Sequence, residues 1–313
     1  MISAVVFAYS EVGQRCLKVL LDHGVRVPLV FTHEDQAGEQ RWFGSVGDLV
    51  RAHGVRVVTP AQPAAPEWLE EVRGCAPDYL LAFYYRCMLP PQLLQIPRWG
   101  ALNMHGSLLP RYRGRAPVNW AIAQGETQTG ATLHYMVAQP DAGPIVAQQA
   151  VAIGPNDDAL AVSMAVAGAA AEVLAAALPG MALRPPPGRP MDLAAGSYFG
   201  GRRPEDGRID PDWPGMRVHA MIRAVAPPFP GAFTEVGGQR LVFVSSHLTG
   251  EAARHPAAAP CLAVNEGRLY LECRDGLRLL ICGVLIDGEA VDGARFQERF
   301  GPQPLRLGFT AQG

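Results

Sequence analysis

Short, continuously apolar runs alternate with helix-like segments through the first half of the chain. The runs "AVVFAY" (4–9), "VPLVFT" (27–32) and "DYLLAFYY" (78–85) have no polar alternation, which is typical of strands buried on both faces of a sheet. Further strands are expected at 55–60, 100–105, 129–137 and 143–153, and helices at 11–24, 44–54, 66–76, 89–96, 117–125 and 157–178. Strands separated by helices predict an α/β fold with a doubly wound, mainly parallel sheet resembling the Rossmann arrangement.

The pattern changes after the proline-rich stretch "RPPPGRP" (184–190). One helix is expected at 216–226, and short apolar strands joined by glycine-containing turns follow it. Such a series is typical of antiparallel hairpins. The sequence therefore predicts an α/β domain over 1–190 and a smaller β-rich, OB-like domain over 205–313.

Charge and composition narrow the class of ligand. The chain of 313 residues has 27 Lys and Arg against 29 Asp and Glu, and Lys18 is its single lysine. A protein that binds nucleic acid usually carries a basic excess, so a small-molecule substrate is favoured. The chain shows no signal peptide and no apolar run of about 20 residues, so we expect a cytoplasmic protein without membrane insertion. The six cysteines form no C-x-x-C pair, so no metal site is expected.

Polar chemistry is concentrated in "ALNMHGSLLPRYRGRAPVNWAI" (101–122). In a strand, Asn103 and His105 would share one face, because alternate side chains point the same way. The end of a strand in an open α/β sheet is where ligands bind. An amide can stabilise an oxyanion, and an imidazole can move a proton. Taken alone, this pair could equally cap a strand, Arg111, Arg113 and Arg115 could form a solvated loop, and "QPDAG" (139–143) could be a plain turn.

Together, "NMHGSLLPRYRGRAPVNWAI" and "GETQTGATLHYMVAQPDAGPIVAQ" closely resemble the N10-formyltetrahydrofolate-dependent formyltransferases. Within that family the sequence is most similar to the formyltransferase half of bifunctional polymyxin-resistance enzymes, as in "VVFAYSEVG", "FYYRCMLP", "SYFGGRRPEDG" and "IRAVAPPFPGAF". The resemblance extends over about residues 1–305, although the dehydrogenase half of those enzymes is absent. It implies N10-formyltetrahydrofolate as co-substrate and no metal.

The resemblance also assigns site residues. It implies that Asn103 and His105 are catalytic and that Asp141 supports the histidine, raising its pKa above that of a free imidazole. The implied folate contacts are Cys87, Met88, Leu89, Arg115, Val137, Ala138, Gln139, Pro140 and Asp141. Two positions depart from the pattern, because Met104 stands where leucine is common and Cys87 replaces a histidine.

The implied reaction is formylation of the 4-amino group of a sugar nucleotide, most simply UDP-4-amino-4-deoxy-L-arabinose. That substrate would connect the protein with lipid A modification and polymyxin resistance. Sugars carried on dTDP or GDP remain open, as do the sugar-nucleotide contact residues and the oligomeric state. The alternatives are a methionyl-tRNA formyltransferase, which the charge balance disfavours, a formyltetrahydrofolate hydrolase with the same three residues, and an inactive binding module.

Overall fold

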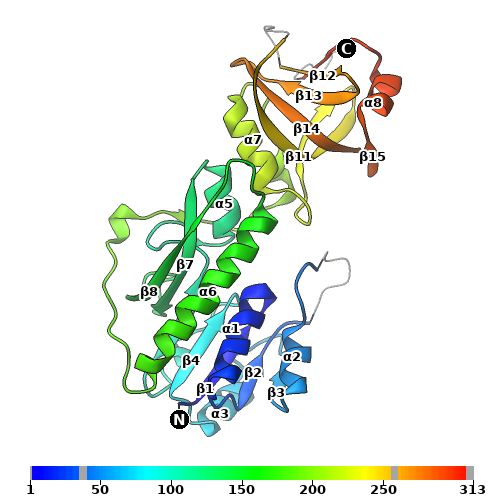
Figure 1. Ribbon diagram of the computed structural model, residues 1–313. Coiled ribbons are helices and arrows are strands. Elements are labelled where there is room, and N and C mark those ends of the chain that lie inside the picture. Colours follow the sequence, from blue (N-terminus) through cyan, green and yellow to red (C-terminus); the bar gives the residue numbers. More distant parts are fainter. Residues whose placement is uncertain (1, 35–40, 255–259, 308–313) are drawn as a thin grey trace. The chain divides into compact units, whose positions relative to one another are not determined.

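The computed structural model describes residues 2–34, 41–254 and 260–307 (Figure 1). The chain divides into two compact units. Unit 1 comprises Met1–Pro117, Gln128–Ala152 and Ser163–Gly200, and unit 2 comprises Val118–Thr127, Ile153–Val162 and Gly201–Gly313. Each unit therefore draws on segments that are distant in the sequence.

Unit 1 is built on a seven-stranded sheet of order β3-β2-β1-β4-β5-β7-β8. The strands are β1 (Ala4–Ala8), β2 (Leu29–Phe31), β3 (Arg56–Val58), β4 (Tyr79–Phe83), β5 (Ala101–His105), β7 (Gln128–Tyr135) and β8 (Ile145–Ala152). The first five are parallel, and β7 and β8 are antiparallel additions. The predicted doubly wound, mainly parallel sheet is confirmed.

Helices join these strands near the predicted positions. They are α1 (Ser10–Asp22), α2 (Val46–Ala52), α3 (Pro66–Gly74), α4 (Pro91–Leu94), α5 (Pro117–Ala123) and α6 (Ala159–Met181). Helix α1 buries Val12, Cys16 and Leu20, which recur at helical spacing. It stops before Gly24, whose φ of +68° suits glycine. In the sheet itself, the stacked rings of Phe7 and Phe31 lie 4.3 Å apart.

Helix α6 corrects the expectation that the chain has no apolar segment of about 20 residues. By length and composition, this 23-residue helix could cross a membrane, and in the part of the chain that the structure describes it is the one helix that passes this test. Its buried side chains include Val162, Val166 and Val173, spaced by four and seven residues. That spacing places them along one stripe of the helix, as in the core helix of a globular domain.

A short parallel pairing in unit 1 was not predicted. Strand β6 (Arg113–Gly114) pairs with β9 (Tyr198–Phe199), so the arginine-rich loop is hydrogen-bonded to a segment 85 residues later. Gly114 has a φ of +98°, and a Cβ at this position would collide with the carbonyl of Phe199. Two-residue strands carry no hydrophobic periodicity, so a pattern in the sequence could not predict them.

Unit 2 contains a second sheet, of order β10-β11-β14-β13-β12-β16, in which β15 also pairs with β14. Its strands are β10 (Ala232–Val236), β11 (Gln239–Ala252), β12 (Cys261–Asn265), β13 (Arg268–Glu272), β14 (Leu277–Ile286), β15 (Glu289–Val291) and β16 (Leu305–Arg306). All of these pairings are antiparallel. Helix α7 (Gly215–Ala224) precedes the strands, as predicted.

A further helix, near the C-terminal end of unit 2, was not predicted. Helix α8 (Gly293–Phe300) lies between β15 and β16, and 3-10 turns occur at Leu193–Ala195 and Pro204–Gly207. The side chain of Asp292 caps α8 by accepting a hydrogen bond from the Arg295 N–H at 2.9 Å. Gly301 follows the helix with a φ of +85°. An Asp before the helix and a Gly after it were usable signals, but eight residues are too few for a clear helical period.

His219, on α7, is buried within unit 2, and both of its ring nitrogens make hydrogen bonds. Its Nε2–H donates to the Pro155 carbonyl at 2.8 Å, so Nδ1 accepts from the Ser246 hydroxyl, also at 2.8 Å. Burial lowers the pKa of His219 to about 4; Arg223 and His247 add to this effect, and the Pro155 carbonyl opposes it. The folded protein therefore holds this imidazole neutral at pH values where an unfolded chain binds a proton.

We expect this histidine to make stability depend on pH. The unfolded pKa is about 6.5, so the stabilisation is complete above that pH and is lost as the pH falls toward 4. The loss should approach about 3 kcal/mol. Between pH 7 and 4.5, the thermal stability of the wild type should fall more than that of His219→Gln. Equal pH slopes for the two proteins would contradict this assignment.

Candidate active site

Three of the predicted residues meet in unit 1. Asn103 and His105 lie on β5, and Asp141 lies in the turn between β7 and β8. Asp141 Oδ1 is 3.4 Å from Asn103 Nδ2 and 3.6 Å from His105 Nδ1. The Gly114 N–H donates to Asp141 Oδ2 at 2.8 Å, which fixes the carboxylate from its other side. The turn therefore folds back onto β5, as the resemblance implied.

His134 is a fourth member of the cluster, and the sequence analysis missed it. It pairs directly with Asn103 across the β5–β7 ladder, and its side chain is buried. Its Nε2 lies 3.1 Å from Asn103 Nδ2 and 3.6 Å from Asp141 Oδ1. The signal available in the sequence was the polar His134 two positions after Thr132 in an otherwise apolar strand, "ATLHYM".

Backbone carbonyls set the tautomers of both histidines. His134 Nδ1 is 2.8 Å from the Tyr135 carbonyl, which can only accept, so the proton lies on Nδ1 and the neutral ring offers Nε2 as an acceptor. Asn103 must therefore present its amide nitrogen to His134. By the same argument, His105 Nε2–H donates to the Tyr112 carbonyl at 2.8 Å. The neutral His105 ring then has a bare Nδ1 beside Asp141.

The electrostatics of the pair correct one expectation. Burial lowers the pKa of His105 below its ordinary value, and His134 adds to the lowering, while Asp141 and the Tyr112 carbonyl oppose it without reversing it. The expectation that the pKa of His105 lies above that of a free imidazole was therefore wrong. Burial alone would raise the pKa of Asp141, but His105, His134 and the Gly114 N–H hold it well below its usual range. At neutral pH the pair is a carboxylate beside a neutral imidazole.

Hydrogen bonds from β7 and β8 hold the loop that follows β5. Thr132 Oγ1 donates to the Ser107 carbonyl at 2.6 Å, and Gln148 Nε2 donates to the Leu109 carbonyl at 2.8 Å. Ser107 Oγ donates to the Arg111 carbonyl at 2.6 Å. These bonds fix the carbonyl of Tyr112 and the N–H of Gly114, on which His105 and Asp141 depend.

Strained backbone gathers in the loops of this region. Tyr84, Tyr112, Ala116 and Asp141 have φ between 50° and 58°, although none of them is glycine. This conformation costs about 1–3 kcal/mol per residue and persists where the surroundings enforce it. Its concentration in the loops after β4, β5 and β7 is typical of a functional site.

The proposed folate residues lie in the loop after β4 and the loop after β7, and Arg115 is added from the loop after β5. Arg115 Nη2 donates to the Arg86 carbonyl at 3.2 Å, so Arg115 lies against the loop that contains Cys87, Met88 and Leu89. Met88 is 66% exposed and Val137 is 42% exposed, which is unusual for large apolar side chains. Both could pack against a flat ring. In the same arginine-rich loop, Arg113 is buried, and Arg111 lies 5.6 Å from the Tyr112 ring.

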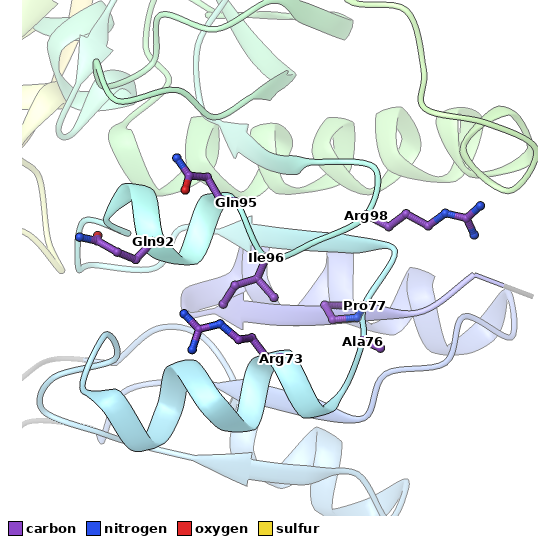
Figure 2. A pocket seen from close by; sticks show the side chains of 7 residues that line it. All are labelled: Arg73, Ala76, Pro77, Gln92, Gln95, Ile96 and Arg98. Atoms are coloured by element: carbon purple, nitrogen blue, oxygen red, sulfur yellow. The ribbon is translucent and has the colours of Figure 1, made fainter.

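One cavity lies away from this site. It has a volume of about 640 Å³ and is lined by Arg73, Ala76, Pro77, Gln92, Gln95, Ile96 and Arg98. These residues lie before β4 and β5, whereas the catalytic candidates lie at the other end of β5. The guanidinium groups of Arg73 and Arg98 point in different directions in Figure 2, so they do not converge on one ligand. In residues 2–34, 41–254 and 260–307, no three His, Cys, Asp or Glu side chains form a potential metal site.

Comparison with known proteins agrees with this arrangement. The formyl transferase family model matches residues 3–178, and the model of the formyl transferase C-terminal domain matches residues 202–300.

Solved structures show the same fold at low identity. An N-formyltransferase from Helicobacter canadensis, in complex with folinic acid and dTDP-3-aminofucose, is 18% identical, with a TM-score of 0.73 over 90% of this chain and 99% of that chain. WlaRD, a sugar 3N-formyl transferase solved in the presence of dTDP and 5-N-formyl-THF, is 16% identical, with a TM-score of 0.71 over 90% of this chain and 97% of that chain. A methionyl-tRNA formyltransferase from Clostridium thermocellum has 16% identity and a TM-score of 0.56 over 80% and 95%. Because the two family models together match most of its length, this chain belongs to the formyl transferase family.

Proposed function

We propose that the protein transfers a formyl group from N10-formyltetrahydrofolate to the amino group of a sugar nucleotide. The observation that carries this proposal is the contact of Asp141 with both Asn103 and His105. The relatives that hold folinic acid or 5-N-formyl-THF together with dTDP or a dTDP-sugar support it. The sequence motifs favour UDP-4-amino-4-deoxy-L-arabinose as the acceptor.

His105 acts first as a base. Its bare Nδ1 takes the proton that the acceptor nitrogen loses as that nitrogen attacks the formyl carbon. The resulting imidazolium keeps its Nε2–H on the Tyr112 carbonyl. It also gains the attraction of Asp141, whose Oδ1 lies 3.6 Å from Nδ1. A base with a lowered pKa and a nearby carboxylate is neutral at rest and is stabilised only once it is charged.

Asn103 stabilises the oxygen of the tetrahedral intermediate. Of its two Nδ2 contacts, the one to Asp141, at 3.4 Å, is longer than the one to His134, at 3.1 Å. The N–H directed at Asp141 is therefore the donor that can turn to an oxyanion. The intermediate collapses when the bond from the formyl carbon to N10 breaks and His105 returns its proton to N10. The products are the formamide and tetrahydrofolate.

The acceptor class follows from charge. The chain has 27 basic and 29 acidic residues, whereas proteins that hold tRNA need a basic surface. A sugar nucleotide carries only the charge of its diphosphate, which a few arginines can match.

Steady-state assays test the proposal directly. The protein is incubated with N10-formyltetrahydrofolate and UDP-, dTDP- or GDP-linked 4-amino sugars, and tetrahydrofolate release and formamide formation are followed together. We expect stoichiometric formylation of one acceptor. Folate release with water alone would identify a hydrolase, and formylation of methionyl-tRNA in place of every sugar nucleotide would overturn the proposal.

His134 should act as a positioning residue. His134→Ala removes the acceptor that holds the Asn103 amide, and one such hydrogen bond contributes about 0.5–1.5 kcal/mol. We expect kcat to fall about 2- to 13-fold, with little change in either KM. His134→Gln can restore an acceptor oxygen and should recover most of kcat. A purely structural role would instead lower thermal stability equally in both variants and leave kcat unchanged.

A further inference from the structure

A second cavity lies apart from the catalytic residues but at the same edge of the unit 1 sheet. Its volume is about 350 Å³, and it lies where β1, β2 and β3 end, with Tyr9, Thr32, His33, Glu34 and Thr59 in its lining. Strands β1 to β5 are parallel, so their carboxyl ends share one edge with His105, the last residue of β5. Ligands of open α/β sheets bind at this edge.

The cavity offers a fixed acceptor. The Thr59 hydroxyl donates to Glu34 Oε1 at 3.2 Å, which orients the carboxylate while leaving it able to accept further bonds. Glu34 comes three residues after β2. In dinucleotide-binding sheets, an acidic side chain near this place accepts the hydroxyls of a ribose. A carboxylate that only accepts is well suited to a vicinal diol, which supplies two donors.

The cavity also offers a fixed donor. The Arg86 N–H donates to His33 Nε2 at 3.0 Å, so the proton of the neutral ring lies on Nδ1. Burial and the charge of Arg86 both lower the pKa of His33, which favours this neutral form. The ring is held flat against Tyr85, with the centroids 4.1 Å apart. His33, which lines the cavity together with Glu34, thus carries its one N–H on Nδ1.

The spacing of the sheet connects this cavity with the catalytic cluster. In the order β3-β2-β1-β4-β5, strand β2 is three positions from β5 and β3 is four. Neighbouring strands are about 4.8 Å apart, so the cavity lies roughly 14–19 Å from His105 along the edge. A nucleoside diphosphate sugar has its diphosphate between the amino sugar and the ribose, and it can extend over such a span. The anionic glutamate tail of a folate would instead meet the negative charge of Glu34.

We propose that this cavity binds the ribose of the sugar-nucleotide acceptor, with Glu34 accepting the hydrogen bonds of its 2′- and 3′-hydroxyls. This inference rests on the proposed function. It makes Glu34 a determinant of the choice between ribonucleotide and deoxyribonucleotide carriers, and it places the diphosphate across the ends of β1 and β4.

Calorimetric titration of the full chain with UDP and 2′-deoxy-UDP, and with GDP and 2′-deoxy-GDP, tests the proposal. We expect the wild type to bind the ribonucleotide of one pair about tenfold more tightly than its 2′-deoxy counterpart. The deoxynucleotide loses one hydrogen bond to a charged group, which accounts for a ratio of this size. Glu34→Ala should reduce that ratio to about one. The same variant should raise the KM for the amino-sugar nucleotide and leave kcat and the folate KM unchanged. Glu70→Ala, which alters an exposed carboxylate on α3, should keep the wild-type ratio.

The outcomes separate the two proposals. If the wild type formylates an amino-sugar nucleotide but does not distinguish ribose from deoxyribose, or does so equally well in Glu34→Ala, the ribose site is overturned and the proposed function stands. If no amino-sugar nucleotide is formylated and no nucleotide binds, both are overturned.

Discussion

Asn103→Ala should lower kcat/KM for formyl transfer by about 10²- to 10³-fold. A single donor to an oxyanion contributes about 2.7–4 kcal/mol to the stability of the transition state, because it acts where water is excluded. In the protein this donor is the Nδ2 group held 3.1 Å from His134 Nε2 and 3.4 Å from Asp141 Oδ1. The contact with the oxygen strengthens as charge develops on it, so the loss should appear in kcat more than in either KM.

The matched control for Asn103→Ala is a variant that loses a side-chain amide outside the catalytic cluster. Gln92→Ala removes an exposed amide on α4, at the cavity lined by Arg73 and Arg98 and away from the catalytic cluster, and should keep wild-type kcat. Stopped-flow measurement of a single turnover with both substrates bound isolates the chemical step. A single-turnover rate for Asn103→Ala within threefold of the wild type would remove Asn103 from the reaction.

Asp141→Asn should be comparably damaging, and it should also change the response to pH. Opposite charges about 4 Å apart attract by roughly 4 kcal/mol at an effective dielectric constant of 20. The observed separation from His105 Nδ1 is 3.6 Å. Asparagine keeps the shape and can still accept from the Gly114 N–H, but it cannot stabilise the imidazolium formed during the reaction. We expect kcat to fall by about 10²- to 10³-fold.

The pH dependence follows from the direction of each shift. Asp141 favours the protonated form of His105, and burial opposes it. Removing the carboxylate leaves burial unopposed by that charge, so the pKa of His105 should fall further. NMR titration of the imidazole should place this pKa below about 6.5 in the wild type and lower still in Asp141→Asn. The acidic limb of the pH–rate profile that His105 controls should move to lower pH.

One result would limit the role of Asp141. An unchanged His105 titration in Asp141→Asn would make Asp141 an orienting residue and not an electrostatic one. The surface variant Asp22→Asn, which removes a carboxylate 2.9 Å from Lys18, is the matched control and should leave both the titration and kcat unchanged.

Local pattern in the sequence was sufficient for most of the fold. Continuous apolar runs such as Ala4–Ala8 and Tyr79–Phe83 are typical of buried strands. The helical segments between them have the length that parallel connections need. The two-residue period of a strand put Asn103 and His105 on one face before any contact was known. These features depend on neighbours in the chain, so the sequence carries them directly.

Contacts between distant segments were decided only by the tertiary structure. Residue types and spacing did not show that Asp141 reaches β5, that His134 pairs with Asn103, or that Arg113 and Gly114 pair with Tyr198 and Phe199. Family resemblance supplied the first of these contacts, and nothing in the sequence supplied the other two. The direction of the His105 pKa was wrong for the same reason. A charged neighbour can be inferred from a motif, but the depth of burial that outweighs it is a property of the whole packed domain.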